Sequence, residues 1–187
     1  MLAKELFTAL RMFLVLTIIL GLIYPSLVTL CAQGFFYHEA NGSLVVVNNE
    51  IIGSKLLGQE FKQDHYFHSR PSATSYATVP SGASNLSITN KVFRDHFLTL
   101  RETLGPNAPA DLLTSSASGL DPHISPRAAF FQLLRIAQSR RLGPDGLSRL
   151  QHLVMSQVEL PTLGFLGNPR VNVLKLNLIL DREFSHE

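Results

Sequence analysis

The sequence predicts an α+β fold, in which one N-terminal transmembrane helix is followed by a single mixed α/β extracytoplasmic domain. Three features of the 187-residue chain indicate this: a long apolar run without charge near the start, a strand–turn–strand pattern after it, and several capped amphipathic helices further along. The net charge is only +2 and the basic residues do not cluster, which argues against nucleic acid as a partner.

The apolar run covers residues 12–38, which include no Asp, Glu, Lys or Arg. As a helix, residues 12–30 would span about 30 Å, the thickness of the hydrocarbon core of a bilayer. A cleaved signal peptide is the alternative, but its apolar core usually covers only about 7–15 residues. A lipoprotein signal is disfavoured because Leu30 precedes Cys31. Cys31 is the only cysteine, so the chain cannot form an internal disulfide. The domain must therefore derive its stability from its hydrophobic core.

The flanking charges predict the orientation of this helix. Lys4, Arg11 and the amino terminus precede it against the single acidic Glu5, and positively charged flanks stay on the cytoplasmic side. We therefore expect the bacterial inner membrane as the location and membrane lipid as one partner, with this order along the chain: cytoplasmic N-terminus at 1–11, transmembrane helix at 12–34 and periplasmic α+β domain at 35–187.

The transmembrane helix carries a stripe of small or hydroxylated residues among bulky apolar ones. Thr17, Gly21, Pro25 and Thr29 recur every four residues. Small side chains let a second helix approach closely within lipid. Pro25 should kink the helix, because its ring crowds the carbonyl of residue 21. The stripe therefore predicts a docking face for other membrane helices. The alternative is that Gly and Pro are simply common in such helices.

The domain after the helix should begin with a hairpin and a long loop. The sequence predicts strands at 44–47 and 50–52 around an Asn48-Asn49 turn. Residues 62–90 lack periodicity and predict a long loop. A helix capped by Asn90 is expected at 91–104, and a short strand at 111–114.

The C-terminal part should be largely helical. Ser125-Pro126 has the pattern of a helix start, predicting a helix over 126–142 that Gly143-Pro144 ends. A second helix should follow at 145–156. The almost wholly apolar stretch 171–180 predicts a buried helix or a buried strand, and we favour the helix.

Two clusters carry side chains of the kind used in catalysis or metal binding. Asp64, His65 and His68 lie close in the long loop, but two imidazoles and one carboxylate are too few for a predicted metal site. Asp121 and His123, with Ser116 or Ser118, have the residue types of a nucleophile, base and acid. No G-x-S-x-G elbow accompanies them, so a turn that satisfies backbone groups is the favoured interpretation.

Residues 114–119 (TSSASG) form a loop of small residues whose backbone amides are of the kind that cradle phosphate. The loop lacks the lysine and the glycine spacing of a Walker motif, so the residues alone do not predict nucleotide binding. Arg70 and Arg127 are each available to pair with a carboxylate, and a solvated surface position is the alternative for both.

Several segments, in order along nearly the whole chain, resemble one known family. They are 24–25 (YP), 41–44 (NGSL), 53–61 (GSKLLGQEF), 66–73 (YFHSRPSA), 81–86 (SGASNL), 118–126 (SGLDPHISP), 164–174 (GFLGNPRVNVL), 176–178 (LNL) and Asp181. On these segments the chain is similar to the C subunit of the bacterial Kdp potassium-transporting ATPase. It departs at Ala83 and Asn168, where Gly and Glu are expected, and the serine stretch before Gly119 is less rich in glycine.

The resemblance implies a non-catalytic accessory subunit of an ATP-driven, high-affinity potassium uptake pump. The implied partners are a channel-like potassium-conducting subunit and a P-type ATPase subunit, which hydrolyses the ATP, so no cofactor is expected on this chain. The resemblance also implies a catalytic chaperone that raises the ATP affinity of the ATPase subunit, with a weak nucleotide-binding role for Ser116, Ser118 and Gly119.

The predicted topology conflicts with direct contact to nucleotide, because ATP is cytoplasmic and residues 114–119 are expected outside. An effect on ATP affinity would then be indirect and modest, about 1–3 kcal/mol. The outer domain would also be placed to cap the potassium entrance. Two other classes stay open: a free-standing membrane-anchored envelope binding protein, and an anchored hydrolase that uses Asp121, His123 and a serine.

Overall fold

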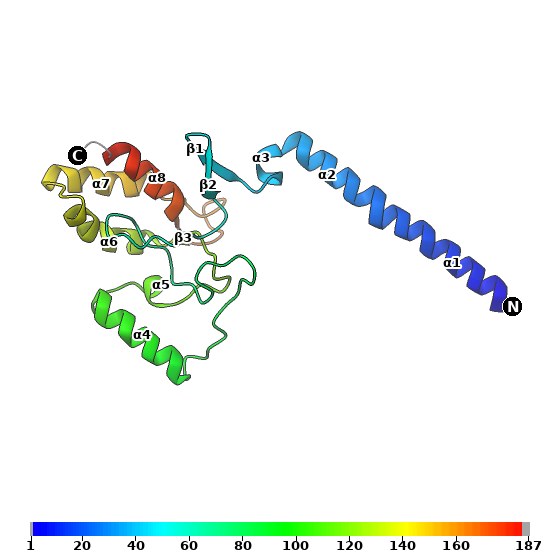
Figure 1. The fold of residues 1–187 in the computed structure, drawn as a ribbon, viewed down its shortest axis with the longest axis horizontal. Helices are drawn as coiled ribbons and strands as arrows, with labels where there is room; N and C mark the ends of the chain where they lie inside the picture. Colours follow the sequence, from blue (N-terminus) through cyan, green and yellow to red (C-terminus); the bar gives the residue numbers. More distant parts are fainter. Residues whose placement is uncertain (1, 185–187) are drawn as a thin grey trace. The chain divides into compact units, whose positions relative to one another are not determined.

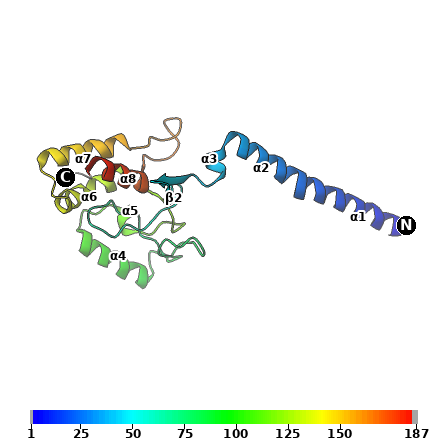
Figure 2. The ribbon, with the colours of Figure 1, turned by 45° about the horizontal axis from the view of Figure 1, so that its top comes forward.

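The structure, a computed structural model, describes residues 2–184 and divides the chain into two compact units, one ending at Ser54 and one beginning at Lys55. Figures 1 and 2 show the first unit as a long helix with a small hairpin and the second as helices joined by long loops. The predicted combination of one long apolar N-terminal helix with a mixed helix-and-strand remainder is confirmed.

The first unit begins with one continuous helix of 34 residues, Leu2–Phe35, long and apolar enough to cross a membrane by length and composition. It consists of α1 (Leu2–Ile18), one π-helical turn η1 (Ile19–Ile23) and α2 (Tyr24–Phe35), and none of its residues is buried. At about 1.5 Å per residue it exceeds the thickness of a bilayer core. The predicted span of 12–34 therefore lies wholly within it.

A short helix, α3 (Tyr37–Ala40), leads to the hairpin of β1 (Leu44–Val47) and β2 (Glu50–Ser54). The strands are antiparallel, with Val47 opposite Glu50. The two turn residues adopt left-handed conformations, with φ of 51° at Asn48 and 69° at Asn49. Asparagine tolerates this conformation better than most residues, so these two residues favour the turn. The predicted hairpin is confirmed.

The second unit contains five helices and two short strands within its described residues: α4 (Lys91–Leu104), α5 (Ala110–Leu113), β3 (His123–Ile124), α6 (Pro126–Ser139), α7 (Pro144–Ser156), β4 (Val171–Asn172) and α8 (Val173–Phe184). Residues 62–90 contain neither helix nor strand, as predicted. Both predicted caps are confirmed: the Asn90 side chain accepts a hydrogen bond from Val92 N, and that of Ser125 from Ala128 N.

Three sequence predictions need correction. The predicted strand at 111–114 is wrong: α5 occupies this segment and buries Leu112 and Leu113 against the core. The helix predicted over 126–142 ends at Ser139, because Arg141 adopts a left-handed conformation with φ of 56°. Gly143 and Pro144 therefore start α7 rather than end α6, with Gly143 as its N-cap. The helix favoured at 171–180 is confirmed only from Val173, since Val171 and Asn172 pair with β3.

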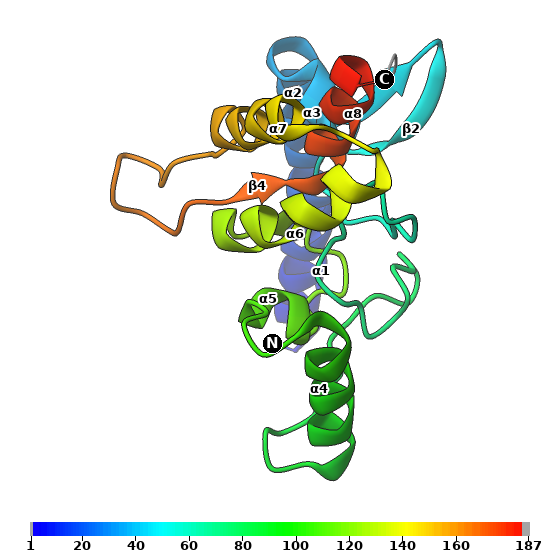
Figure 3. The same cartoon turned by 90° about the vertical axis from the view of Figure 1, so that its left-hand side faces the viewer.

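The core of the second unit lies between α6, α7, α8 and the β3–β4 pair, and in the view of Figure 3 β4 lies between α6 and α7. In the strand pair, Ile124 lies opposite Val171. The largest fully buried apolar side chains come from these helices, from β4 and, in one case, from the long loop: Phe67, Ile136, Leu150, Val154, Val171, Val173, Leu176 and Leu180. The loop residue is Phe67, so the long loop contributes directly to the core.

Candidate functional site

The predicted docking stripe lies on the N-terminal helix, around the π-helical turn. The backbone N–H of Tyr24 donates to the carbonyl of Ile19, five residues back, rather than four. Pro25 follows immediately and has no N–H to offer the carbonyl of Gly21. The chain thus accommodates the proline with a widened turn just before it, and the Thr29 hydroxyl donates to the Pro25 carbonyl over 2.8 Å.

This wider turn brings the stripe onto one face. At about 100° per residue, the twelve steps from Thr17 to Thr29 would leave their side chains about 120° apart around a regular α-helix. Because a π-helical turn takes up one additional residue, the effective separation is eleven steps, or about 20°. Gly21 and Pro25 then fall within about 60° of the same line. The sequence pattern predicted the stripe, but its alignment depends on η1.

The long loop holds no open histidine cluster, because side chains from two helices fix the backbone at residues 67 and 68. Asn177 of α8 donates to the carbonyl of Phe67 over 3.0 Å and accepts from its N–H over 2.8 Å. Gln132 of α6 does the same for His68, at 3.2 and 2.7 Å. Each buried carboxamide thus pairs with a backbone N–H and carbonyl, as a neighbouring β-strand would. We call this arrangement the amide clamp.

Two arginines, one in α6 and one directly after it, extend the amide clamp to the neighbouring loop residues. Arg135 donates to the carbonyls of Asp64 and Tyr66, and Arg140 donates to the carbonyl of His65. Arg140 also pairs with the carboxylate of Asp181.

The Tyr66 hydroxyl donates to the same Asp181 carboxylate over 2.7 Å. Burial, together with this hydrogen bond, raises the pKa of Tyr66 above its usual value. For His68, burial and the charge of Arg135 lower the pKa. Among residues 2–184, no group of three or more His, Cys, Asp or Glu side chains is placed to hold a metal ion.

Asp121 and His123 lie together, but around an arginine rather than a nucleophile. An oxygen of the Asp121 carboxylate lies 3.2 Å from Nη1 of Arg70. The other accepts the backbone N–H of His123 over 3.0 Å and lies 3.6 Å from its Nδ1. Burial acts to raise the pKa of Asp121, but the bonds from His123 and the charge of Arg70 outweigh it, so this pKa is lowered. The arrangement is that of a stabilised turn, and Arg70 has the carboxylate partner considered for it.

The small-residue loop at 114–119 packs against another part of the long loop. Ser116 is buried and its N–H donates to the carbonyl of Pro71. The Ser118 hydroxyl accepts the N–H of Leu120 over 3.1 Å. Gly119 has a φ of 71°, and a Cβ there would lie 2.7 Å from the carbonyl oxygen of Gly82. Nucleotide binding by this loop stays a prediction, and these bonds are those of a closed turn.

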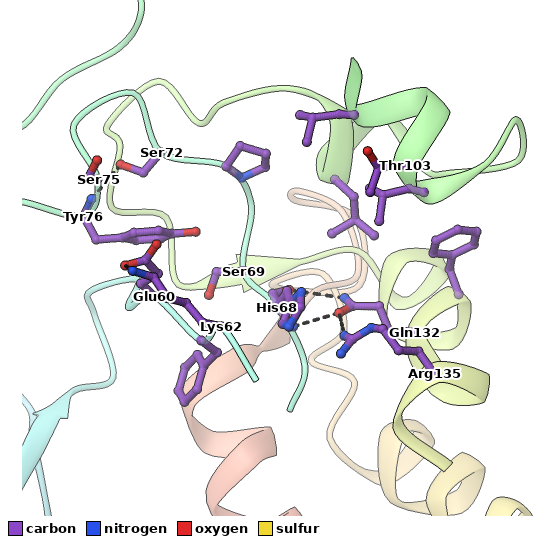
Figure 4. A pocket seen from close by; sticks show the side chains of 16 residues that line it. Glu60, Lys62, His68, Ser69, Ser72, Ser75, Tyr76, Thr103, Gln132 and Arg135 are labelled. Carbon is purple, nitrogen blue, oxygen red and sulfur yellow. Dashed lines mark hydrogen bonds and ion pairs between the residues drawn. The ribbon is translucent and has the colours of Figure 1, made fainter. Parts of the chain in front are cut away.

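A pocket of 580 Å³ opens between the long loop, the end of α4 and α6 (Figure 4). Polar side chains that line it already form hydrogen bonds within the chain. Gln132 binds both His68 and Arg135, as the dashed lines in Figure 4 mark. The hydroxyl of Tyr76 donates to the carbonyl of Arg70 over 2.6 Å, and burial raises its pKa to about 12. The pocket therefore offers space beside apolar side chains, and the polar groups named here stabilise the fold.

Sequence reasoning missed two features. The buried amides Gln132 and Asn177 gave no signal beyond being polar residues within apolar helical patterns. The hairpin at 159–170 was also missed, although Pro161, Gly164 and Gly167 interrupt its apolar residues in the manner of turns.

Comparison with known proteins gives a consistent result over nearly the whole chain. A family model described as "KdpC: K+-transporting ATPase, c chain" matches residues 6–182. A potassium-transporting ATPase KdpC subunit from Leptospira interrogans is 44% identical, with 95% of this chain and 93% of the relative covered. KdpC subunits from Koribacter versatilis (45% identical; 95% and 94% covered) and Rhodopseudomonas palustris BisB5 (46%; 95% and 96%) are similar to the same degree.

Proposed function

Because this chain belongs to the KdpC family, the c chains of K+-transporting ATPases, we propose that it is a non-catalytic subunit that stabilises the assembled potassium pump. Its partners are then the other pump chains: a channel-like potassium-conducting subunit and the P-type subunit that hydrolyses ATP. The inner membrane is the proposed location, reached through the single long apolar helix.

This proposal rests on the exposure of the long N-terminal helix. None of its residues is buried within the chain, although its composition is strongly apolar. The widened turn gathers Thr17, Gly21, Pro25 and Thr29 on one face. Since apolar burial does not drive association within lipid, close van der Waals packing at small residues is one of the interactions that hold membrane helices together. The stripe is therefore the proposed contact with a membrane helix of another pump chain.

A bulky residue at the centre of the stripe tests this contact. Outside the adjacent backbone of its own helix, a Cβ at Gly21 meets no atom of the chain within 4 Å, so the chain leaves room for the side chain of Gly21→Ile. Gly34 is equally open but lies five residues beyond Thr29, about 140° around the helix. After gentle solubilisation through a tag, Gly21→Ile should recover less of the ATPase chain, and Gly34→Ile the normal amount. Equal recovery from both variants would contradict the docking face.

We further propose that the N-terminus is cytoplasmic and that the second unit lies in the periplasm, as the flanking charges indicate. Protease added to intact spheroplasts should digest the second unit. Full protection of that unit would contradict the orientation and would make direct contact with ATP possible again.

With this orientation, any effect on the ATP affinity of the ATPase chain is indirect, through assembly. Removal of the chain should then change the apparent ATP affinity of the pump by about 5–150-fold, the range of typical couplings between sites. Ser118→Ala should leave that affinity unchanged in the assembled pump. A large change with normal assembly would instead favour the nucleotide role of Ser116, Ser118 and Gly119.

The periplasmic unit would also be placed to cap the potassium entrance of the channel-like chain. A chain that ends after Ser54 keeps the whole first unit and tests this. We expect the shortened chain to lower the apparent potassium affinity of the pump. An unchanged affinity with normal assembly would remove the cap. A chain that purifies alone would remove the pump role and favour a free-standing envelope binding protein.

A further inference from the structure

The β1–β2 hairpin of the first unit exposes aliphatic side chains on one face. Within the described residues, β1 and β2 form a sheet of two strands in which Val46 lies opposite Ile51. Leu44, two residues before Val46, lies on the same face because side chains alternate along a strand. Leu44 is 40% exposed, Val46 56% and Ile51 65%. We call these three residues the aliphatic face.

The aliphatic face lacks a supporting surface within the chain. A hairpin of two strands is marginally stable in water unless its apolar side chains pack against another surface. A contiguous exposed apolar group of this kind indicates a contact outside the chain. The charged residues between positions 35 and 55 are Glu39, Glu50 and Lys55 only, and none belongs to the aliphatic face. The contact it requires is therefore apolar rather than ionic.

Hydrogen bonds hold the hairpin beside the end of the long helix. The Asn41 side chain donates to the side chain of Gln33 in α2 over 3.1 Å and to the carbonyl of Tyr37 over 2.6 Å. At the base of the hairpin, the Ser54 hydroxyl donates to the carbonyl of Gly42 over 2.7 Å. The chain thus turns back toward the helix before β1 begins, and Figure 1 shows α3, β1 and β2 in succession after α2.

The end of this helix has the composition of a membrane interface. The apolar run suited to the hydrocarbon core ends at Leu30, and Gln33 follows about 5 Å further along the helix axis. Residues 35–37 (FFY) are exposed aromatic side chains, a type enriched where hydrocarbon meets the lipid headgroups. Because Asn41 is bound to Gln33, the hairpin begins close to this level.

We propose that the aliphatic face lies on the lipid bilayer, at the boundary between headgroups and acyl chains around the end of the transmembrane helix. This inference rests on the proposed location of that helix. The contact is shallow, because each strand of a two-stranded sheet has an open edge whose backbone groups need water. As an interfacial anchor, the hairpin sets the depth and rotation of the helix, and therefore the direction in which its docking stripe faces.

A single fluorophore tests the depth of this contact. The chain contains no tryptophan, so Ile51→Trp places the only one on the aliphatic face. We reconstitute the full chain into phosphatidylcholine vesicles whose acyl chains are brominated either near the headgroups or near the bilayer centre. Bromine near the headgroups should quench this tryptophan more strongly. Leu20→Trp, in the middle of the apolar run, should show the reverse order.

Two double variants in the Ile51→Trp chain separate the aliphatic face from the tryptophan itself. Leu44→Thr with Val46→Thr keeps side chains that suit a strand but makes the face polar, and most of the quenching should be lost. Val45→Thr with Val47→Thr, on the opposite face, is the matched control and should keep it. Equal quenching in both variants would mean that the tryptophan alone seeks the interface, and would contradict the inference.

The remaining outcomes separate this inference from the proposed location. Absence of quenching at position 51, with the expected order at position 20, would remove the lipid contact but leave the helix in the membrane. Loss of that order at position 20 would remove the proposed location as well. Because the contact is not ionic, added phosphatidylglycerol should leave the quenching at position 51 unchanged, and a marked rise would contradict an apolar contact.

The intact assembly provides the last measurement. We replace Ile51 with benzoyl-phenylalanine in the full chain, irradiate the assembled pump in its membrane and identify the adducts by mass spectrometry. Lipid adducts are expected at this position. Adducts with protein alone would show that another polypeptide covers the aliphatic face, and would overturn the proposed lipid contact.

Discussion

Two loop segments of the second unit have opposite designs. The segment at 64–68 is rich in polar and aromatic residues, yet Phe67 is fully buried and its backbone is bound by side chains of α6 and α8. The hairpin at 159–170 is rich in apolar residues, yet it is exposed and bound by its own backbone. Composition alone would have predicted an exposed segment at 64–68 and a buried one at 159–170.

The difference shows what burial of a loop requires. Unpaired backbone groups are costly to bury, so the segment at 64–68 enters the core only because Gln132 and Asn177 bind its N–H and carbonyl groups. The hairpin meets its own backbone requirements and needs no such support. Its apolar side chains therefore remain exposed. The first segment serves the stability of the core, and the second stays outside it.

The largest effect that tests this comparison is expected at Asn177. Asn177→Leu keeps a side chain of similar size but leaves the buried N–H and carbonyl of Phe67 without partners. The free energy of unfolding should fall by roughly 3–5 kcal/mol. The midpoint of thermal unfolding, followed by circular dichroism of the full chain in detergent, should drop by roughly 6–20 °C.

The matched control for this change lies in the hairpin. Asn168 is exposed, so Asn168→Leu should change the free energy of unfolding by no more than about 0.5 kcal/mol. Similar losses from both variants would mean that asparagine content, rather than the amide clamp, determines stability.

A second large effect is expected at Gln132, whose carboxamide also binds Arg135. Gln132→Leu should lower the free energy of unfolding by roughly 2–3 kcal/mol. The loss is smaller than at Asn177 because His68 is only partly buried. Combined with Asn177→Leu in a double-mutant cycle, the two losses should not add, since they release adjacent residues of one segment. Strict additivity would mean that the two amides act separately.

In the hairpin, a substitution should act in the opposite direction. Leu163→Asn relieves the left-handed leucine and replaces a side chain that is 79% exposed. The free energy of unfolding should therefore rise, by up to about 1 kcal/mol. Thermal unfolding of the isolated chain measures this. A marked loss of stability would show that Leu163 contributes to the fold and would weaken the contrast between the two segments.

The smallest effect concerns pH. Burial and the charge of Arg135 lower the pKa of His68 below its ordinary 6.5, so the folded chain binds this proton less readily than the unfolded chain. The contribution of neutral His68 to the free energy of unfolding is fully present above about pH 6.5, and it is lost as the pH falls below that value. His68→Gln should flatten this acidic decline in the midpoint of thermal unfolding, and Leu163→Asn should keep it. An unchanged slope in His68→Gln would place the sensitivity elsewhere.

Much of the fold could be predicted because its signals are local. The apolar run identified the long helix, Asn48-Asn49 the hairpin turn, and Asn90 and Ser125 the starts of α4 and α6. Prediction failed where a distant partner decided the outcome. Leu112 and Leu113 are compatible with a strand, but the core position they fill belongs to a helical turn. Val171 and Asn172 leave the helical pattern because β3 pairs with them.

The same division holds for the candidate sites. The sequence by itself determined the apolar helix, the four-residue spacing of its small residues and the family, because composition, spacing and ordered motifs are all properties of the linear chain. Only the tertiary structure decided that the long loop enters the core and that the apolar hairpin stays outside. The physical reason is separation along the chain: Phe67 and Asn177 are 110 residues apart, and His68 and Gln132 are 64 apart. Hydrogen bonds over such distances depend on the packing of three helices, which no local pattern records.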